Sequence, residues 1–350
     1  MEGEMNTMTR HDPTQGHTPS GAVPTMRAVV QDRYGAAPEG LLRCAETARP
    51  QIGPGEVLVR VCAASVDRGT WHMMAGLPYP VRAAGFGLRR PKNANPGRAL
   101  AGVVAAVGAD VTGLEPGDEV LGVGAATFAE YACARADKLA KKPANLSFAQ
   151  AATLGVSGLT ALQAVRNHAR VTAGQKVLVL GASGGVGAFA VQLAKADGAE
   201  VTGVCSTTKV GLVRSLGADR VVDYTREDAL DGGTQYDVII DTGGNRRLAD
   251  LRRALTATGR LVIVGGETGG RWLGGTDRQL RAQLLSGFVG QRLGSFLTSE
   301  NATDLGALAH LCASGDLTAA VDRTYPLAET AAAIRHMLDG HVRGKVVITV

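Results

Sequence analysis

Apolar and polar positions along the chain follow two different patterns. In the first part, short apolar runs alternate with polar residues between turns rich in Pro and Gly, as in residues 26–31, 55–66, 101–108 and 117–124. Period-two alternation is typical of strands with one exposed face, and Pro-Gly dipeptides are typical of turns. This part of the sequence has no regular alternation of strands with helices. We therefore predict a compact, mostly antiparallel β domain.

A different pattern begins near Lys142. Residues 147–169 have the spacing of a helix, and Ser147 followed by Gln150 predicts a capping box at its start. Apolar strands then alternate with helices. The predicted strands are 176–181, 200–205, 220–224, 236–244 and 259–266. Strand–helix alternation predicts a parallel, doubly wound sheet, so the chain as a whole has an α/β fold.

The end of the sequence returns to a mixture of helices and short strands. The predicted helices are 302–314 and 327–340, and the predicted strands are 321–326 and 344–350. A chain that leaves one domain and later returns to it produces this order. The domains that we expect are 26–145 with 300–350, and 146–299. Residues 1–25 are polar and aperiodic, so we expect a disordered tail.

Composition and charge narrow the class of protein. Of 350 residues, 45% are hydrophobic and 20% are charged, which is enough for two buried cores. The formal net charge of +5 is spread along the chain, and nucleic-acid surfaces need clustered charge, so we expect no nucleic-acid partner. The five cysteines form no C-x-x-C pair, which is typical of reduced thiols. We see neither a signal peptide nor a membrane span, and expect a cytoplasmic protein that acts on a small molecule.

The most informative motif is GASGGVG, residues 181–187, between a predicted strand and a predicted helix. One glycine permits a tight turn, another lets a pyrophosphate approach the backbone, and a third lets the helix pack on the strand. The helix start then offers free N–H groups to the phosphates. The alternative is a glycine-rich turn without a ligand, but the flanking elements favour dinucleotide binding. A Walker A loop is excluded, because no Lys-Ser/Thr follows. The expected phosphate-binding residues are Ser183, Gly184, Gly185 and Val186.

The strand after this helix ends without an acidic residue. In an NAD site an Asp or Glu at this end binds the ribose hydroxyls, but Cys205 stands here and is followed by Ser206, Thr207 and, two residues on, Lys209. A carboxylate would repel a 2′-phosphate, whereas hydroxyls and an ammonium group would donate to it. We therefore predict NADPH as the cofactor. The alternative is that these are ordinary polar loop residues.

Together these motifs, with AASVDRGTW, LAGVVAAVGADVTGLEPGDEVLG, GLTALQAV and GKVVITV, resemble the medium-chain dehydrogenase/reductase superfamily. The resemblance runs from Met26 to Val350 and is greatest to the zinc-free quinone-oxidoreductase branch and nearby NAD(P)-dependent alcohol dehydrogenase-like sequences. It implies a GroES-like catalytic domain, built from both chain ends, around a Rossmann domain, with the cofactor in the cleft between them.

The resemblance also implies roles for individual residues. Tyr224 matches a tyrosine on the 2′-phosphate side of the cofactor, although an edge or core tyrosine is the alternative. Thr160 matches a position beside the nicotinamide. Gly243, Val264 and Gly265 match strand ends that lie under the cofactor.

The same resemblance argues against zinc. At the positions where the zinc-dependent branch has its ligands, this chain has Ala64, Arg98, Ala99 and Val156. None of these side chains is a zinc ligand, so we expect no metal. The zinc-free branch usually carries an Asp where Ala99 stands, so no catalytic role is given to that position.

Without a metal, substrates that are already electron-poor are favoured. Quinones and conjugated enones spread charge along their π systems, and one hydrogen-bond donor suffices. The candidate catalytic residues are Tyr79, His72 and Asp67, with a core or surface histidine and a positioning aspartate as the alternatives. The function hypotheses are an NADPH-dependent quinone or enone reductase, an alcohol, aldehyde or enoyl-thioester oxidoreductase of the same fold, and a non-catalytic NADPH-binding protein.

The apolar stretch from Phe288 to Phe296 predicts an edge strand. We expect it to pair between two subunits and form a homodimer, because an unpaired apolar edge invites association. The alternative is a strand internal to one sheet.

Overall fold

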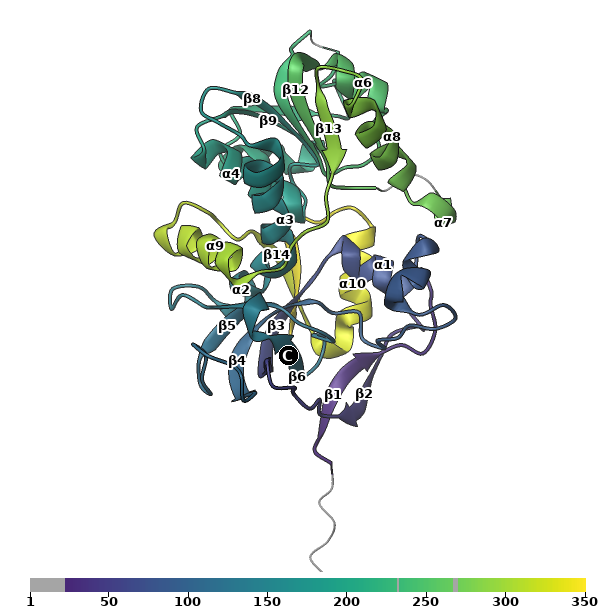
Figure 1. Cartoon of the computed structure of the whole chain (residues 1–350), viewed down its shortest axis with the longest axis vertical. Helices are drawn as coiled ribbons and strands as arrows, with labels where there is room; N and C mark the ends of the chain where they lie inside the picture. The colour runs from purple at the N-terminus through teal and green to yellow at the C-terminus, as the bar shows by residue number, and fades with distance from the viewer. Residues whose placement is uncertain (1–22, 232, 267–269) are drawn as a thin grey trace, which may run out of the picture.

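The computed structural model describes residues 23–231, 233–266 and 270–350, and these form two lobes along the long axis of the molecule (Figure 1). Each lobe contains one large sheet. The lobe drawn at the bottom of Figure 1 holds strands from both the N-terminal and the C-terminal parts of the chain, and the lobe at the top holds the middle of the chain.

The sheet of the lower lobe has the order β14-β15-β3-β4-β5-β7, with β6 paired to β3. Its strands are β3 (Glu56–Val66), β4 (Ala99–Val107), β5 (Glu119–Val123), β6 (Tyr131–Arg135), β7 (Leu139–Lys141), β14 (Val321–Pro326) and β15 (Lys345–Thr349). All pairs are antiparallel except β14 with β15. A separate hairpin joins β1 (Thr25–Val30) to β2 (Arg43–Ala48). The mostly antiparallel β domain is therefore confirmed, and its sheet includes the last strands of the chain.

The sheet of the upper lobe is parallel throughout, with the order β10-β9-β8-β11-β12-β13. Its strands are β8 (Lys176–Leu180), β9 (Glu200–Cys205), β10 (Arg220–Asp223), β11 (Tyr236–Asp241), β12 (Leu255–Ile263) and β13 (Arg292–Ser295). The order reverses between β8 and β11, which makes this a doubly wound dinucleotide-binding sheet. The expected parallel sheet is confirmed.

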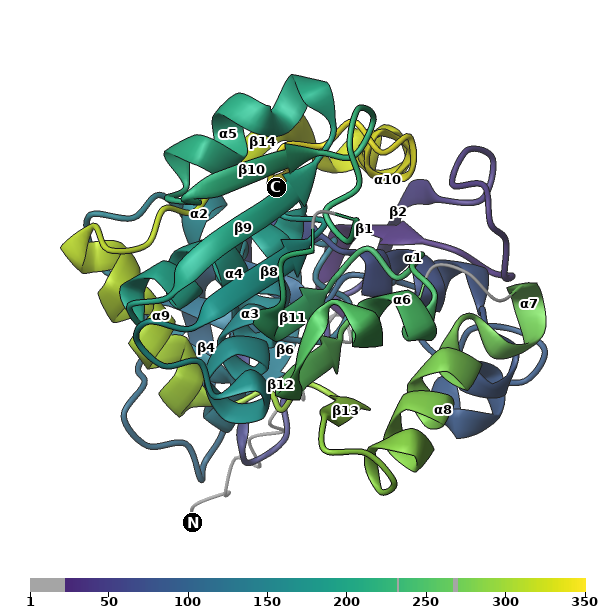
Figure 2. The same cartoon turned by 90° about the horizontal axis from the view of Figure 1, so that it is seen from above.

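Helices cover both faces of the parallel sheet (Figure 2). Apolar side chains of α4 (Gly185–Ala196) and α5 (Val210–Ser215) pack on one face, and those of α6 (Leu248–Arg253) and α8 (Thr276–Ser286) pack on the other. A short helix, α7 (Gly270–Leu273), precedes α8. Ligands of such sheets bind beyond the carboxyl ends of the strands, and this edge of the sheet faces the other lobe (Figure 1).

A nearly continuous helical segment joins the lobes. It comprises α2 (Phe148–Ala152), the π-helical η3 (Leu154–Gly158), α3 (Leu159–Leu162) and the π-helical η4 (Gln163–Ala169). The predicted capping box is confirmed: the Gln150 N–H donates to Ser147 Oγ at 3.2 Å, and the Ser147 N–H donates to Gln150 Oε1 at 3.0 Å. One apolar core runs through this segment into both sheets, from Leu121 in β5 to Ile240 in β11.

The C-terminal part adds α9 (Ala302–Ser314) and α10 (Thr330–Leu338) to the strands β14 and β15. The helices 302–314 and 327–340 and the strands 321–326 and 344–350 are thus confirmed, with shorter limits for the second helix. The domain limits at 145/146 and 299/300 stay predictions. Of the expected tail, residues 1–22 lie outside the described residues, and Thr25 belongs to β1.

Two expectations were wrong in detail. Residues Arg68–Ala75 form a helix, α1, that we did not predict within the mostly antiparallel lobe. Only Arg292–Ser295 of the stretch 288–296 is a strand, because α8 continues to Ser286 and residues 287–291 turn back toward the sheet. The strand does lie at the edge of its sheet, since β12 is its one partner within the described chain.

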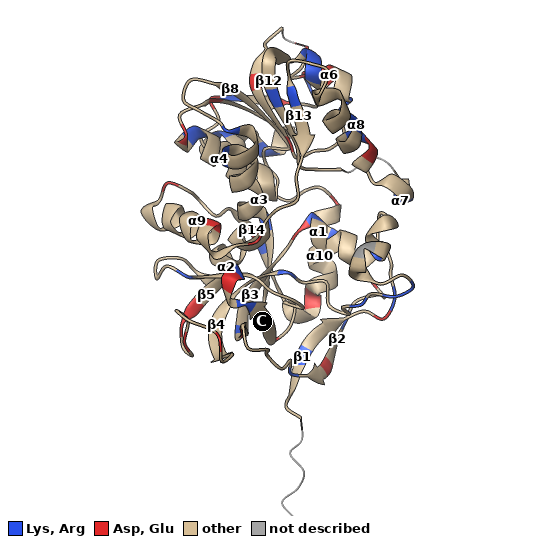
Figure 3. Cartoon of the chain, in the orientation of Figure 1, with Lys and Arg blue, Asp and Glu red and all other residues tan. Residues whose placement is uncertain are grey.

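Three further properties of the described residues bear on function. Lys and Arg are mixed with Asp and Glu on both lobes (Figure 3). Among the described residues, no helix is long and apolar enough to cross a membrane. All five cysteines are free thiols, as the absence of paired spacing predicts.

Candidate functional site

The glycine turn connects β8 to α4 at the carboxyl edge of the parallel sheet. Gly181 has a φ of +76°, which strains any residue with a side chain. A Cβ on Gly187 would overlap the carbonyl oxygen of Gly181, so this glycine lets the helix approach the strand. At Gly184 the nearest atom to a Cβ would be 3.4 Å away, so this glycine is not required by the fold.

The start of α4 fits a dinucleotide pyrophosphate. Gly184 is the N-cap residue, and no side chain caps the helix. The first turn contains no acidic residue, and a Cβ at Gly184 would make only an ordinary van der Waals contact, 3.4 Å from the Gly181 carbonyl oxygen. The N–H groups of the first turn are therefore available to an anion, and the helix dipole favours one.

The C-terminal strand reaches this turn from the other lobe. The Gly344 N–H donates to the Ser183 carbonyl oxygen at 2.9 Å. The next residue, Lys345, extends its side chain past Gly185, where a Cβ would lie 2.8 Å from Lys345 Cδ. The phosphate turn is thus supported by a strand of the antiparallel sheet.

Lys345 ends in a buried polar cluster. Its Nζ donates to the Val66 carbonyl oxygen at 2.8 Å and to Ser157 Oγ at 3.0 Å, and it forms a close ion pair with Asp67 Oδ1. Ser157 Oγ donates to the same carboxylate oxygen at 2.6 Å. The Lys345 and Asp67 side chains are only 3% and 7% exposed. Three segments that are distant in the sequence are therefore held together by one buried charge pair.

The contacts of this cluster bear on the two roles considered for Asp67. One carboxylate oxygen holds Lys345 and Ser157, and the other is buried without a hydrogen-bond partner among the described residues. A carboxylate in these surroundings fixes the start of α1 beneath the phosphate turn. The geometry favours the positioning role over that of an acid.

His72 and Tyr79 have other partners. His72 Nδ1 lies 2.9 Å from the Leu77 carbonyl oxygen, which only accepts, so Nδ1 carries the proton in this contact. The Tyr79 N–H donates to the Arg271 carbonyl oxygen at 2.8 Å, and its ring packs edge-on against Trp272 at 5.2 Å. Tyr79 thereby bridges from the antiparallel lobe to α7. The three candidate catalytic residues are held by different partners and do not form one unit.

At the far end of β9, an acidic residue is present after all. Asp223 of β10 is the register partner of Cys205, and its side chain accepts from Thr207 Oγ1 at 2.5 Å and from Thr225 Oγ1 at 2.8 Å. The Thr207 hydrogen bond is the main cause that holds the Asp223 pKa below its usual value. The sequence pattern missed this acid because it comes from the neighbouring strand.

This contact bears on the role expected of Thr207, which stays a prediction. Its hydroxyl hydrogen points to Asp223 and is not available to a phosphate, while Ser206 has no such contact among the described residues. Lys209 Nζ donates to the Gly340 carbonyl oxygen at 2.7 Å, and burial lowers its pKa.

A second cation lies beside Lys209. Arg343 is exposed and close enough to lower the pKa of Lys209 further. Tyr224, whose N–H donates to the Cys205 carbonyl oxygen at 3.1 Å, is 57% exposed and is therefore not a core residue. Sequence reasoning missed Arg343, because it lies in the last segment of the chain. Its only sequence signal is the pair of cations around Gly344.

On the other side of the turn, the ends of β11 and β12 meet. The N–H groups of Val264 and Gly265 donate to the Asp241 carbonyl oxygen at 2.9 and 3.1 Å. Near Gly243 a Cβ would contact only two side-chain oxygens, at 3.7 and 3.8 Å, so this backbone is open to a ligand. The structure therefore brings Gly243, Val264 and Gly265 together at one edge, as expected.

Two further contacts organise this edge. The Asp241 carboxylate is fully buried and pairs with Arg278 of α8 at 2.7 Å. Thr160 Oγ1 donates to the Val156 carbonyl oxygen at 2.8 Å and lies 2.9 Å from Thr298 Oγ1. Thr160 is thus in contact with the segment by which the chain returns to the first lobe.

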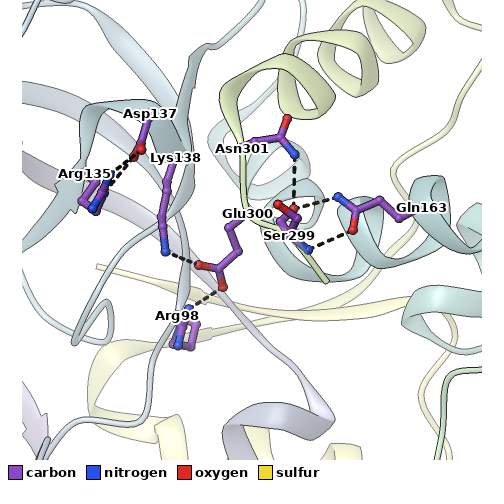
Figure 4. Close-up of polar contacts among 8 residues, drawn as sticks. All are labelled: Arg98, Arg135, Asp137, Lys138, Gln163, Ser299, Glu300 and Asn301. Carbon is purple, nitrogen blue, oxygen red and sulfur yellow. Dashed lines mark hydrogen bonds and ion pairs between the residues drawn. The ribbon is translucent and has the colours of Figure 1, made fainter. Parts of the chain in front are cut away.

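That returning segment is held by a polar cluster (Figure 4). The Glu300 carboxylate pairs closely with Arg98 and accepts from Lys138 Nζ at 2.7 Å. Gln163 of η4 donates to the Ser299 carbonyl oxygen at 2.7 Å and accepts from the Ser299 N–H at 2.9 Å. Arg98 therefore serves an ion pair at a position where the resemblance would place a zinc ligand.

The other three positions compared with zinc ligands carry no donor atom in their side chains. Ala64 and Ala99 are fully buried, and Val156 packs against the core. Among the residues that the structure describes, no group of three or more His, Cys, Asp or Glu side chains is arranged to hold a metal ion. Zinc independence stays a prediction that rests on these residue types.

Comparison with protein families matches two parts of the chain. Residues 53–144 match the family described as "Alcohol dehydrogenase GroES-like domain", and residues 216–348 match the family described as "Zinc-binding dehydrogenase". The first match covers most of the antiparallel lobe. The second covers the later strands of the parallel sheet and the C-terminal segment that returns to the antiparallel lobe.

Whole-length relatives agree with these matches. The chain is 31% identical to a chloroplastic quinone oxidoreductase of Triphysaria versicolor, over 92% of this chain and 98% of the relative. It is 32% identical to a mitochondrial NAD(P)H oxidoreductase of Mus musculus, over 95% and 91%. The solved quinone oxidoreductase of Coxiella burnetii is 30% identical, with a TM-score of 0.79 over 93% of this chain and all of that one.

Proposed function

Because this chain belongs to the medium-chain dehydrogenase/reductase superfamily, in its quinone oxidoreductase-like branch, we propose that it is a zinc-independent oxidoreductase that uses NADPH to reduce a quinone or a conjugated enone. The observation that carries the proposal is the open phosphate turn at Gly184, next to cations at Lys209 and Arg343 and without zinc donors at the ligand positions. A bound nicotinamide cofactor supplies the hydride.

The residues of this chain divide the work of holding that cofactor. N–H groups at the start of α4 bind the pyrophosphate, with Gly184 leaving room for it. Lys345 and Asp67 keep the turn, α1 and β15 in register. Gly243, Val264 and Gly265 expose backbone beside the nicotinamide ring, with Thr160 nearby. Most of these contacts orient the cofactor and exclude water from it. Hydride transfer requires both of these from the protein.

The substrate class follows from the absence of Lewis-acid ligands in this sequence. Ala64, Ala99 and Val156 offer no donor, and Arg98 is engaged with Glu300. A simple ketone then lacks polarisation, whereas a quinone or enone accepts hydride with one hydrogen bond to its oxygen. We propose Tyr79 as that donor, because its hydroxyl donates to no described residue.

The test is oxidation of NADPH, followed by absorbance, with quinones, conjugated enones and aldehydes as acceptors. We expect turnover with quinones or enones, no effect of a chelator, and no stoichiometric zinc by elemental analysis. One zinc per chain that the chelator removes together with activity would overturn zinc independence. Cofactor binding without turnover on every acceptor would point instead to a non-catalytic NADPH-binding protein, and turnover of aldehydes alone to the alcohol dehydrogenase-like alternative.

Cofactor preference provides a second test. We expect a higher kcat/KM with NADPH than with NADH, because Lys209, Arg343 and Ser206 can donate to a 2′-phosphate. Charge-assisted hydrogen bonds contribute about 1.5–3 kcal/mol each, reduced by exposure and salt, so two of them give a preference of roughly a hundredfold. Arg343→Ala and Lys209→Ala are each expected to lower kcat/KM with NADPH and to leave kcat/KM with NADH nearly unchanged, when the two cofactors are measured side by side.

Controls separate charge from shape in this experiment. Cys205→Asp introduces a second acid next to Asp223 and is expected to erode the preference for NADPH. Arg214→Ala removes an exposed arginine from α5 and is expected to change neither cofactor. Equal losses for both cofactors in the Lys209 and Arg343 variants would mean that these cations do not contact the phosphate.

We also make proposals on the oligomeric state and on the cellular location of the protein. We propose a homodimer that pairs through the edge strand β13, and its oligomeric state is measured in the experiment of the next subsection. We also propose a cytoplasmic location, although the named relatives are chloroplastic and mitochondrial.

A further inference from the structure

A cavity of about 390 Å³ lies at the edge of the parallel sheet, on β12 and β13. Arg260 and Arg292 are register partners on these strands, and both line the cavity. The opposite wall is formed by His168 of η4, whose ring stacks on Phe296 at 4.1 Å. Figure 3 shows basic residues on both of these strands. The glycine turn follows β8, which is separated from β12 by β11, so the cavity is about 10 Å or more away from it.

Positive charge gathers at this cavity without a compensating acid. Arg170, at the end of η4, is a third arginine close to Arg260. None of the three forms an ion pair or donates a side-chain hydrogen bond to a residue that the structure describes. Burial, together with the charges of Arg292 and Arg170, lowers the pKa of Arg260. On the opposite side of the same sheet, Arg278 is paired with the buried Asp241, whereas Arg260 and Arg292 have no acidic partner among the described residues.

We propose that this cavity is an anion site, separate from the dinucleotide turn, that binds a phosphate-bearing small molecule. Guanidinium groups match the oxygens of phosphate in planar, bidentate geometry, and the two that line the cavity, with Arg170 close to Arg260, favour an oxyanion with more than one charge. The stacked rings of His168 and Phe296 add an apolar wall beside the charges. The cavity has room for a phosphate group and part of the molecule that carries it. This site is independent of the proposed reductase activity.

A second copy of the chain that pairs through β13 would not bring an acid from that strand, because β13 (Arg292–Ser295) contains no acidic residue. A protein partner could instead fill the cavity with acidic side chains, and the experiment distinguishes this occupant from a small molecule.

The test compares inorganic phosphate and pyrophosphate with sodium chloride at equal ionic strength. Thermal melting and titration calorimetry are measured for the wild type and for Arg260→Gln/Arg292→Gln, with light scattering to record the oligomeric state. We expect a saturable rise in Tm with phosphate, and a loss of roughly tenfold or more in pyrophosphate affinity in the double variant. Without phosphate, the double variant should melt higher than the wild type, because repulsion among the arginines is relieved.

Matched variants locate the response. Arg214→Gln, on the exposed face of α5, should respond to phosphate like the wild type. Lys209→Ala/Arg343→Ala, which removes cations of the proposed dinucleotide site, should keep the part of the response that Arg260→Gln/Arg292→Gln loses. An equal rise in Tm with sodium chloride would overturn the proposal, because it would show that salt only screens the repulsion among the arginines. A response lost with Lys209 and Arg343 would assign it to the dinucleotide turn. No phosphate response, with a changed monomer–dimer equilibrium in the arginine double variant, would assign the cavity to a protein partner.

Discussion

Lys345→Ala is expected to lower the free energy of unfolding by about 3–5 kcal/mol, because it leaves the Asp67 carboxylate buried without its charge partner. The two side chains are almost completely buried, and the amine also holds Ser157 and the Val66 carbonyl oxygen. Denaturant unfolding measures this change. Because the same side chain passes under Gly185, we also expect cofactor affinity to fall, measured by titration of NADPH at a temperature where the variant is folded.

A double-mutant cycle separates the charge pair from simple loss of packing. Lys345→Met/Asp67→Asn removes both charges and keeps most of the volume, so it should recover much of the stability that Lys345→Met alone loses. Arg335→Ala, which breaks an exposed bidentate pair with Glu39, serves as the surface control and should change stability little. Equal stability of the Lys345→Ala variant and the wild type would show that Asp67 is not a buried charge.

Gly187→Ala is expected to lower the stability of the protein, whereas Gly184→Ala is expected to lower its affinity for the cofactor. The alanine at 187 would overlap the Gly181 carbonyl oxygen, so α4 must move away from β8. Overpacking of this kind costs about 1–3 kcal/mol and outweighs the gain of about 1 kcal/mol in helix propensity, so Tm should fall. The alanine at 184 has an ordinary backbone conformation and 3.4 Å to its nearest neighbour, so Tm should hardly change.

Cofactor titration completes this comparison. If the pyrophosphate approaches Gly184, the added methyl group removes one or two hydrogen bonds from α4, and affinity should fall by about ten- to a hundredfold without loss of stability. The pair of variants thereby separates a glycine that the fold requires from one that the ligand requires. An unchanged cofactor affinity in Gly184→Ala would move the phosphates away from this part of the turn.

Much of the architecture could be predicted from the sequence, because it depends on local periodicity. Val177 to Leu180 are consecutive apolar residues, which is the pattern of a strand buried on both faces, and the glycines that follow permit a tight turn into a helix. Ser147 and Gln150 are three residues apart, so their capping box is also a local property. The stretch 284–296 was less predictable, because Leu284 and Leu285 fit both a strand and the last turn of α8.

Contacts between distant residues were decided only by the tertiary structure. Asp67, Ser157 and Lys345 are polar residues in three separate segments, and nothing in their spacing indicates that they share one buried site. Asp223 was hidden from the sequence pattern because pairing between β9 and β10, rather than position along one strand, brings it beside Cys205. Periodicity determines which face of an element is buried. Which side chains then meet depends on strand order and register. In this protein, strand order and register bring charged side chains to the phosphate turn and to the arginine cavity.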